Sequence, residues 1–195
     1  MLGIVLAVDD LLRTALHAAA ETRNAGDVIR LLGDGNDVDP RDYCYYTPLH
    51  LAAGVGAAEV VALLLAAGAD PAALTAFRTT PLHDAAAGGG LAPVADRLAI
   101  IDRLLTAGSP IDAVDSSGRT ALWYAAATGT TERAAEEQAT RFRVLQLLLN
   151  RGADPTIAAA GTQGRAVDAA QGMHQAKKYR HAWPDAVALL QAARP

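Results

Sequence analysis

Three histidines recur at one place in a repeated phrase, and they are the first residues whose type suggests chemistry. His17, His50 and His83 each follow a threonine by three residues, and these threonines stand at positions 14, 47 and 80. Imidazoles bind Zn²⁺ or relay protons when several of them converge on one point. Packed helices lie about 8–10 Å apart, whereas a shared zinc ion needs its ligands at about 2 Å. We therefore expect no metal site and no cofactor at these histidines.

A cysteine nucleophile is the second chemistry to consider, because Cys44 precedes His50 closely in the chain. Such a nucleophile needs a base and a third group that orients the base, and no third group stands out near this pair. The sequence contains no nucleophile elbow, phosphate loop, zinc-protease helix or dinucleotide fingerprint. The glycine run at 88–90 follows an expected helix rather than a strand, so it does not form a phosphate cradle. We predict no catalytic residues and a protein that is not an enzyme.

One alternative of a different class stays open near the C-terminus. Asp168, His174 and His181 are acids and bases within one stretch, and they could serve a hydrolase or a small-ligand site. The same stretch carries the basic cluster of residues 177–181. That cluster could contact an acidic partner or a phosphate backbone, but a solvated loop suits it better because the chain has a net charge of −4.

The histidines belong to a phrase that occurs four times and once more in degenerate form. The copies begin at Thr14, Thr47, Thr80 and Thr120, and the degenerate copy begins at Arg165. Threonine before an apolar run is a helix N-cap, and proline is tolerated at the next position. Leu49, Ala52 and Ala53 share one face of the helix that follows. The phrase therefore predicts a short helix with a small-residue face in every copy.

A second, more apolar helix is predicted after each short one. Its segments are 28–32, 60–65, 100–105, 144–149 and 185–190. A glycine follows four of these segments, at Gly35, Gly68, Gly108 and Gly152, where it supplies a left-handed C-cap.

Together these phrases resemble the ankyrin repeat over about residues 9–193. The signature is Thr-Pro-Leu-His followed by Ala-Ala, a Val-x-x-Leu-Leu helix and a Gly-Ala-Asp turn at a 33-residue period. The resemblance implies an all-α solenoid of about five helix-turn-helix repeats with hairpin loops, held together by contacts between neighbours. It also implies that the repeated histidine ties a loop to a helix. We predict a single domain, 1–195, with repeats at about 9–39, 40–72, 73–112, 113–156 and 157–195.

Two hairpins depart from the family pattern. Ankyrin repeats usually hold aspartate five residues, and glycine two residues, before the threonine, as Asp115 and Gly118 do. Tyr45 replaces the glycine in repeat two, and Thr75 and Arg78 replace both residues in repeat three. We therefore expect unusual shapes for these two hairpins.

Extra residues fall between the first and second helices of repeats 3, 4 and 5. They are 88–97, where Pro93 would be the first helical residue, 129–143, where Thr131 would cap a long extension, and 173–181. Insertions in a solenoid gather on one face, so these would form a ledge opposite the hairpins. The ledge is either functional or a product of drifting loop length.

Aromatic residues concentrate in the hairpins and first helices, which form the usual binding groove of the family. Tyrosine, tryptophan and arginine are favoured at the energetic centres of interfaces. The predicted partner-binding residues are Arg41, Tyr43, Tyr45, Tyr46, Phe77, Arg78, Asp84, Arg119, Trp123 and Tyr124. The alternative is structural: Tyr45 and Phe77 would pack between hairpins, and Trp123 would fill the place of the histidine.

Composition narrows the function. Of 195 residues, 51% are hydrophobic and 19% are charged, and the mild acidity gives no reason to expect nucleic acid as a partner. No apolar run reaches the length of about 18 residues that a membrane helix needs, and a single cysteine fits a reducing, cytoplasmic compartment.

We expect a monomer, bacterial by its heavy use of alanine, that binds another protein through its concave groove and hairpins. It would act as an inhibitor, an immunity-type protein or a regulator; a structural accessory that stabilises a co-expressed enzyme is the remaining alternative.

Overall fold

The computed structural model describes residues 12–88, 92–127, 134–160, 164–171 and 184–193. Within these ranges the chain is mostly helical, and it forms two compact units. Unit 1 ends at Ser109 and unit 2 begins at Pro110. The single domain expected for 1–195 stays a prediction.

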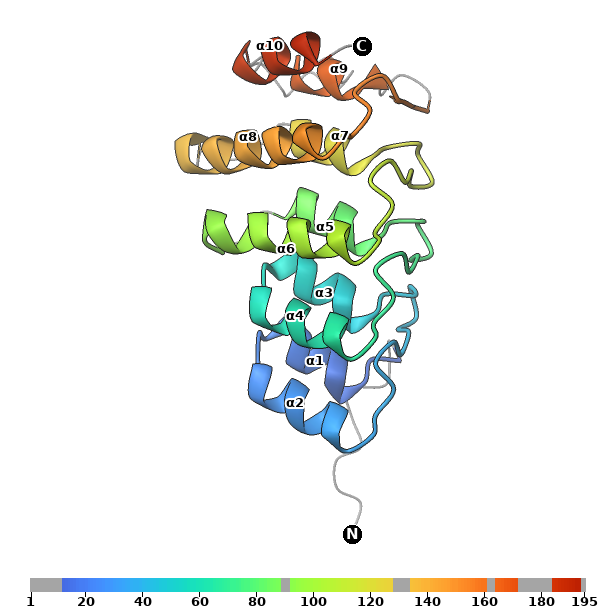
Figure 1. Ribbon diagram of the computed structural model, residues 1–195. Helices are drawn as coiled ribbons and strands as arrows, with labels where there is room; N and C mark the ends of the chain where they lie inside the picture. The colour runs from blue at the N-terminus through green and yellow to red at the C-terminus, as the bar shows by residue number, and fades with distance from the viewer. Residues whose placement is uncertain (1–11, 89–91, 128–133, 161–163, 172–183, 194–195) are drawn as a thin grey trace. The chain divides into compact units, whose positions relative to one another are not determined.

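Unit 1 consists of three helix pairs, each a first helix followed by a second one. The helices are α1 (Ala15–Glu21), α2 (Ala25–Gly33), α3 (Pro48–Val55), α4 (Ala58–Ala66), α5 (Pro81–Ala87) and α6 (Val94–Thr106). The first helices form one layer, in which α3 packs between α1 and α5. The second helices form the other layer, in which α4 packs between α2 and α6. The loops that lead into α3 and α5 lie along one edge of the unit (Figure 1).

Small side chains bring the first helices close together. Leu49, Ala52 and Ala53 of α3 are fully buried, as the shared helix face predicts. The helix boundaries also fall where they are expected. Proline is the first residue of α3 and of α5, and Gly68 and Gly108 follow α4 and α6 with φ of 92° and 100°.

Unit 2 repeats this arrangement. It holds α7 (Ala121–Ala126), α8 (Ala134–Asn150), β1 (Ala158–Ala159), β2 (Gly164–Arg165), α9 (Ala166–Ala170) and α10 (Pro184–Ala192). Helix α7 packs on α8 and α9, and α9 packs on α10. The antiparallel pair of two-residue strands, with Ala158 opposite Arg165, is a hairpin of the repeat and not a separate sheet layer. The all-α solenoid class is therefore confirmed.

The extra residues of repeats 3 and 4 lengthen their second helices. Helix α6 has 13 residues and α8 has 17, compared with nine in α4. Pro93 precedes α6 as its N-cap and is not its first helical residue as expected, because its ψ of 144° is extended. In α8, Arg141 Nη1 donates to the carbonyls of Tyr124 and Ala127 at 3.3 and 2.6 Å, so the extension caps the end of α7. Thr131 and residues 173–181 lie outside the described residues.

The hairpins of repeats two and three have ordinary shapes, so the expectation of unusual ones was wrong. Tyr45 and Arg78 adopt φ of 64° and 60°, in the left-handed region that Gly118 occupies with φ of 76°. In all three hairpins the N–H of this residue donates to the carbonyl three residues earlier, at 2.9–3.0 Å. Non-glycine residues thus take the backbone conformation that glycine usually supplies.

The other departure from the pattern is also compensated locally. Asp42 Oδ1 accepts the N–H groups two and four residues later, both at 2.9 Å, and Asp115 does the same at 2.7 and 2.9 Å. Thr75 Oγ1 accepts the two equivalent N–H groups at 3.2 Å. In the hairpin of repeat three, a hydroxyl therefore accepts the two hydrogen bonds that a carboxylate accepts in the other two hairpins.

Candidate functional site

His17 and His50 join neighbouring repeats. His50 Nδ1 lies 3.2 Å from the Thr47 N–H and 2.9 Å from its hydroxyl, while Nε2 lies 3.2 Å from the carbonyl oxygen of Thr79. His17 makes the same contacts one repeat earlier, with Nε2 2.9 Å from the Tyr46 carbonyl. A carbonyl only accepts, so Nε2 carries the proton and Nδ1 is the acceptor. His17 and His50 thus link a helix start to the next hairpin.

Burial keeps His50 neutral. Desolvation lowers its pKa from 6.5 to about 4, and its backbone hydrogen bonds oppose this shift only in part. Both of its ring nitrogens are engaged with Thr47 and Thr79, so the structure does not pair His50 with Cys44 as a base with a nucleophile.

Asp168 plays the part of the histidine in the last repeat. Its Oδ2 accepts the N–H of Arg165 at 2.7 Å, at the start of α9. The other two residues of the C-terminal alternative, His174 and His181, lie outside the described residues. Asp168 is thus engaged in starting a helix.

Three large side chains project from the two hairpins of unit 1. Tyr43 is 70% exposed, and Tyr45 and Phe77 are each 54% exposed. Arg41 and Arg78 are exposed beside them. We call these five residues the hairpin surface. Because more than half of Tyr45 and of Phe77 faces solvent, these two residues do not pack between hairpins as the structural alternative required.

Hydrogen bonds between the two hairpins fix the surface. Arg41 Nη1 donates to the carbonyl of Leu74 at 2.9 Å, and the Ala76 N–H donates to the carbonyl of Cys44 at 2.9 Å. The guanidinium of Arg41 also lies 5.9 Å from the ring centre of Tyr45. A surface held in place before binding loses less conformational entropy when a partner docks.

Sequence reasoning missed one member of this edge. Leu74, the residue next to Thr75, is 36% exposed and accepts the hydrogen bond from Arg41. The signal that could have found it was a large aliphatic residue in an alanine-rich loop.

Two further predicted residues are recessed at the base of the hairpin surface. The ring of Tyr46 meets that of His50 edge-on, with ring centres 5.6 Å apart. Burial raises the pKa of Tyr46, and the nearby charge of Asp84 raises it further. Burial also raises the pKa of Asp84, to about 7. The charge of Asp84 therefore acts on Tyr46.

The predicted residues of unit 2 are engaged with one another. Arg119 Nη2 and the Tyr124 hydroxyl each approach Asp115 Oδ2 at 2.7 Å, and the guanidinium lies 4.8 and 5.3 Å from the ring centres of Tyr124 and Trp123. Burial alone would raise the pKa of Asp115, but hydrogen bonds from Arg119, Tyr124 and Ser117 outweigh it and lower the pKa. Trp123 is only 6% exposed and occupies the place of the histidine. This cluster fixes its own hairpin.

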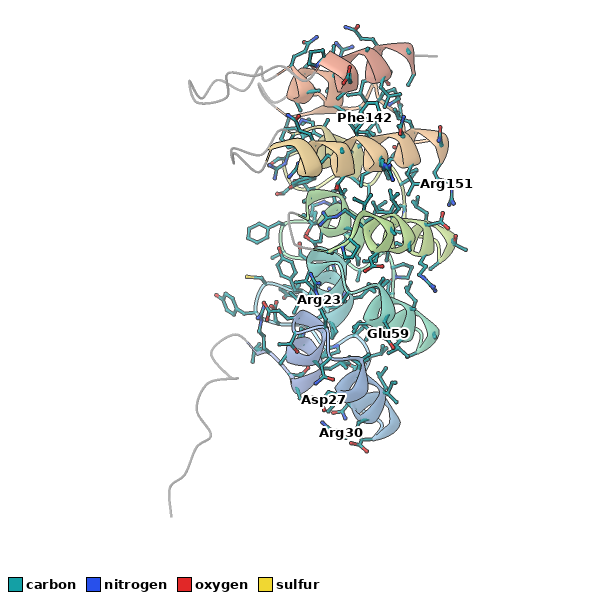
Figure 2. All side chains as sticks on the ribbon, turned by 90° about the vertical axis from the view of Figure 1, so that its left-hand side faces the viewer. Arg23, Asp27, Arg30, Glu59, Phe142 and Arg151 are labelled. Carbon is teal, nitrogen blue, oxygen red and sulfur yellow. The ribbon has the colours of Figure 1, made fainter. Side chains whose placement is uncertain are left out.

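The face away from the hairpins carries charged side chains. On α2, Asp27 and Arg30 form an ion pair at 3.0 Å and lie at the surface of the unit, and Glu59 lies on α4 (Figure 2). Exposed pairs of this kind contribute about 0–1 kcal/mol and mark a solvated surface.

Comparison with known families places this architecture. The family described as "Ankyrin repeats (3 copies)" matches residues 6–75, which include α1 to α4, and the family described as "Ankyrin repeat" matches residues 117–160, which include α7 and α8. No curated protein sequence matches the chain. None of the helices in the described part of the chain combines the length and the apolar character that crossing a bilayer requires. The two matches span more than half of the sequence and agree with the repeated fold, so the chain belongs to the ankyrin repeat family.

Proposed function

We propose that this chain is a binding module that takes a partner protein on the hairpin surface of unit 1. Ankyrin repeats are in general modules for protein–protein interaction, which supports the class of function. The observation that carries the proposal is the exposure of two tyrosines, a phenylalanine and two arginines on hairpins that are tied together. These residue types supply large contact area with polar ends.

The backbone at the hairpin tips supports the same reading. Gly118 shows that glycine suffices for this turn, yet Tyr45 and Arg78 occupy the same left-handed position. A non-glycine residue there costs about 1–2 kcal/mol. Because glycine suffices for this turn, we attribute the side chains of Tyr45 and Arg78 to contacts with a partner.

The chemistry of the surface describes the partner. Arg41 and Arg78 favour carboxylates, and the aromatic rings favour an apolar patch beside them. We propose an inhibitory, immunity-type or regulatory role, because a preformed surface can block a partner without chemistry of its own.

The experiment is affinity capture from an extract of the source organism, with quantitative mass spectrometry. Wild type is compared with the triple variant Tyr43→Ala, Tyr45→Ala, Phe77→Ala. The matched control is Ile29→Ala, because Ile29 is 56% exposed but lies on α2, away from the hairpins. Thermal unfolding first establishes that all three proteins are folded.

We expect wild type and the Ile29 variant to enrich the same protein and the triple variant to lose it by about tenfold or more. Equal recovery by the folded triple variant would show that binding, if present, uses another face.

A further inference from the structure

Asp84 is an acid that the fold of unit 1 does not use. It lies in the first turn of α5, at the place where α1 has Ala18 and α3 has Leu51. Part of the residue is exposed, but its Oδ2 is buried, and no group among the described residues gives that oxygen a hydrogen bond. A buried carboxylate oxygen without a donor costs about 1–3 kcal/mol or more.

The neighbours of Asp84 do not compensate its charge. Desolvation raises its pKa, and the buried guanidinium of Arg97 on α6, which lies near the Asp84 backbone carbonyl, does not lower it. From the hairpin before α3, Tyr46 adds an uncharged phenol, and from α3 the residue facing it is Gly54. A Cβ at position 54 would lie 3.7 Å from the Cβ of Asp84, so the glycine leaves this approach without a covering side chain.

We infer that Asp84 anchors a cationic side chain, a lysine or an arginine, of the partner protein. This inference rests on the proposed function and names one chemical group of the partner. A cation beside an ionised carboxylate forms a charge-assisted hydrogen bond and removes the cost of an isolated charge. A neutral donor would leave that charge unbalanced, and no group of three or more metal-ligating side chains was found within the described residues.

The arrangement also orients the partner. The hairpin surface presents two arginines, whereas the recessed end beside Tyr46 presents a carboxylate. A partner that places an acidic group on the two arginines and a basic group on Asp84 can bind in one orientation only.

The test uses the full chain and two defined cations. Methylguanidinium chloride stands for arginine and n-butylammonium chloride stands for lysine, with sodium chloride at equal ionic strength as the reference. The chain carries ¹³C-labelled aspartate, and the Asp84 carboxyl signal is followed by NMR across pH 5–9. The carboxylate of Asp27, already paired with Arg30, is the internal control.

We expect at least one organic cation to shift the Asp84 signal saturably and to lower the midpoint of its titration by about half a pH unit or more. A response to methylguanidinium would identify an arginine of the partner, and a response to n-butylammonium would identify a lysine. The Asp27 signal should not respond to either cation. In the Asp84→Asn variant, adding the cation should leave the amide signals of Tyr46 and Gly54 unchanged. Equal Asp84 midpoints in all three salts would overturn the inference.

The experiments can distinguish a failure of the cation anchor at Asp84 from a failure of the proposed binding at the hairpin surface. The hairpin triple variant keeps Asp84 and should still bind the cation. With the captured partner, Asp84→Asn should weaken binding by about tenfold or more. A partner that needs the hairpin aromatics but ignores Asp84→Asn would refute the cation anchor and leave the hairpin surface standing.

Discussion

At the scale of single residues, the hairpin tips of unit 1 hold a strained backbone that a glycine would relieve. Tyr45→Gly and Arg78→Gly should each raise the free energy of unfolding by about 0.5–1 kcal/mol, because relief of left-handed strain exceeds the extra unfolded-state entropy of glycine. Urea unfolding measures the change. The opposite substitution provides the control: Gly118→Ala should destabilise by about 2 kcal/mol, since its φ is 76° and a Cβ would lie 2.9 Å from the Ala160 nitrogen. A loss of stability in both glycine variants would mean that the side chains stabilise the fold.

Asp84 gives a second prediction at this scale. Its pKa is 3.8 in the unfolded chain and about 7 in the folded chain, so the folded state binds more protons between these values. The contribution of Asp84 to stability is therefore complete at low pH and is lost as pH rises through about 7. Asp84→Asn should become progressively more stable than wild type from about pH 4 to 7, by up to about 1.4 kcal/mol per pH unit, and then level off. Unfolding curves at a series of pH values measure the difference, and a difference that does not change with pH would contradict the assignment.

At the scale of elements, local sequence decides where each helix begins and ends. The Thr-Pro-Leu-His phrase predicted the starts of α3 and α5, and the glycine turns predicted the ends of α4 and α6. The hairpin shapes could not be predicted, because the sequence does not reveal that Tyr45 and Arg78 accept positive φ or that Thr75 replaces a carboxylate. Hydrogen bonds within each hairpin hold these shapes.

The histidine links are the element-scale feature that mutation can test. His50→Ala leaves the buried Thr47 N–H without a partner and removes one of the two hydrogen bonds to the Thr79 carbonyl, so it should cost about 2–3 kcal/mol. The folded pKa of about 4 lies below the unfolded 6.5, so the unfolded state binds more protons in this window and stability falls as pH drops from 6.5 towards 4. The gap between wild type and variant should narrow over that range and stay constant above it. A gap that widens on acidification would show that His50 is charged in the folded protein.

At the scale of the whole molecule, each short helix is too small to bury its apolar face alone, and stability comes from neighbouring repeats within each unit. The sequence predicted that arrangement and the gathering of aromatic residues at the hairpins. It could not separate the exposed aromatics of unit 1 from those engaged in unit 2. The burial of Trp123 depends on tertiary neighbours, which residue type and spacing do not reveal.

The central claim is that the hairpin surface binds a protein, and the most direct test is the dissociation constant of the purified partner. Isothermal titration calorimetry would compare wild type, the triple variant and Ile29→Ala under one set of conditions. Three contact residues of about 1 kcal/mol each predict a loss of about 100-fold for the triple variant and no more than about a twofold change for the control. A folded triple variant that binds as tightly as wild type would contradict this account.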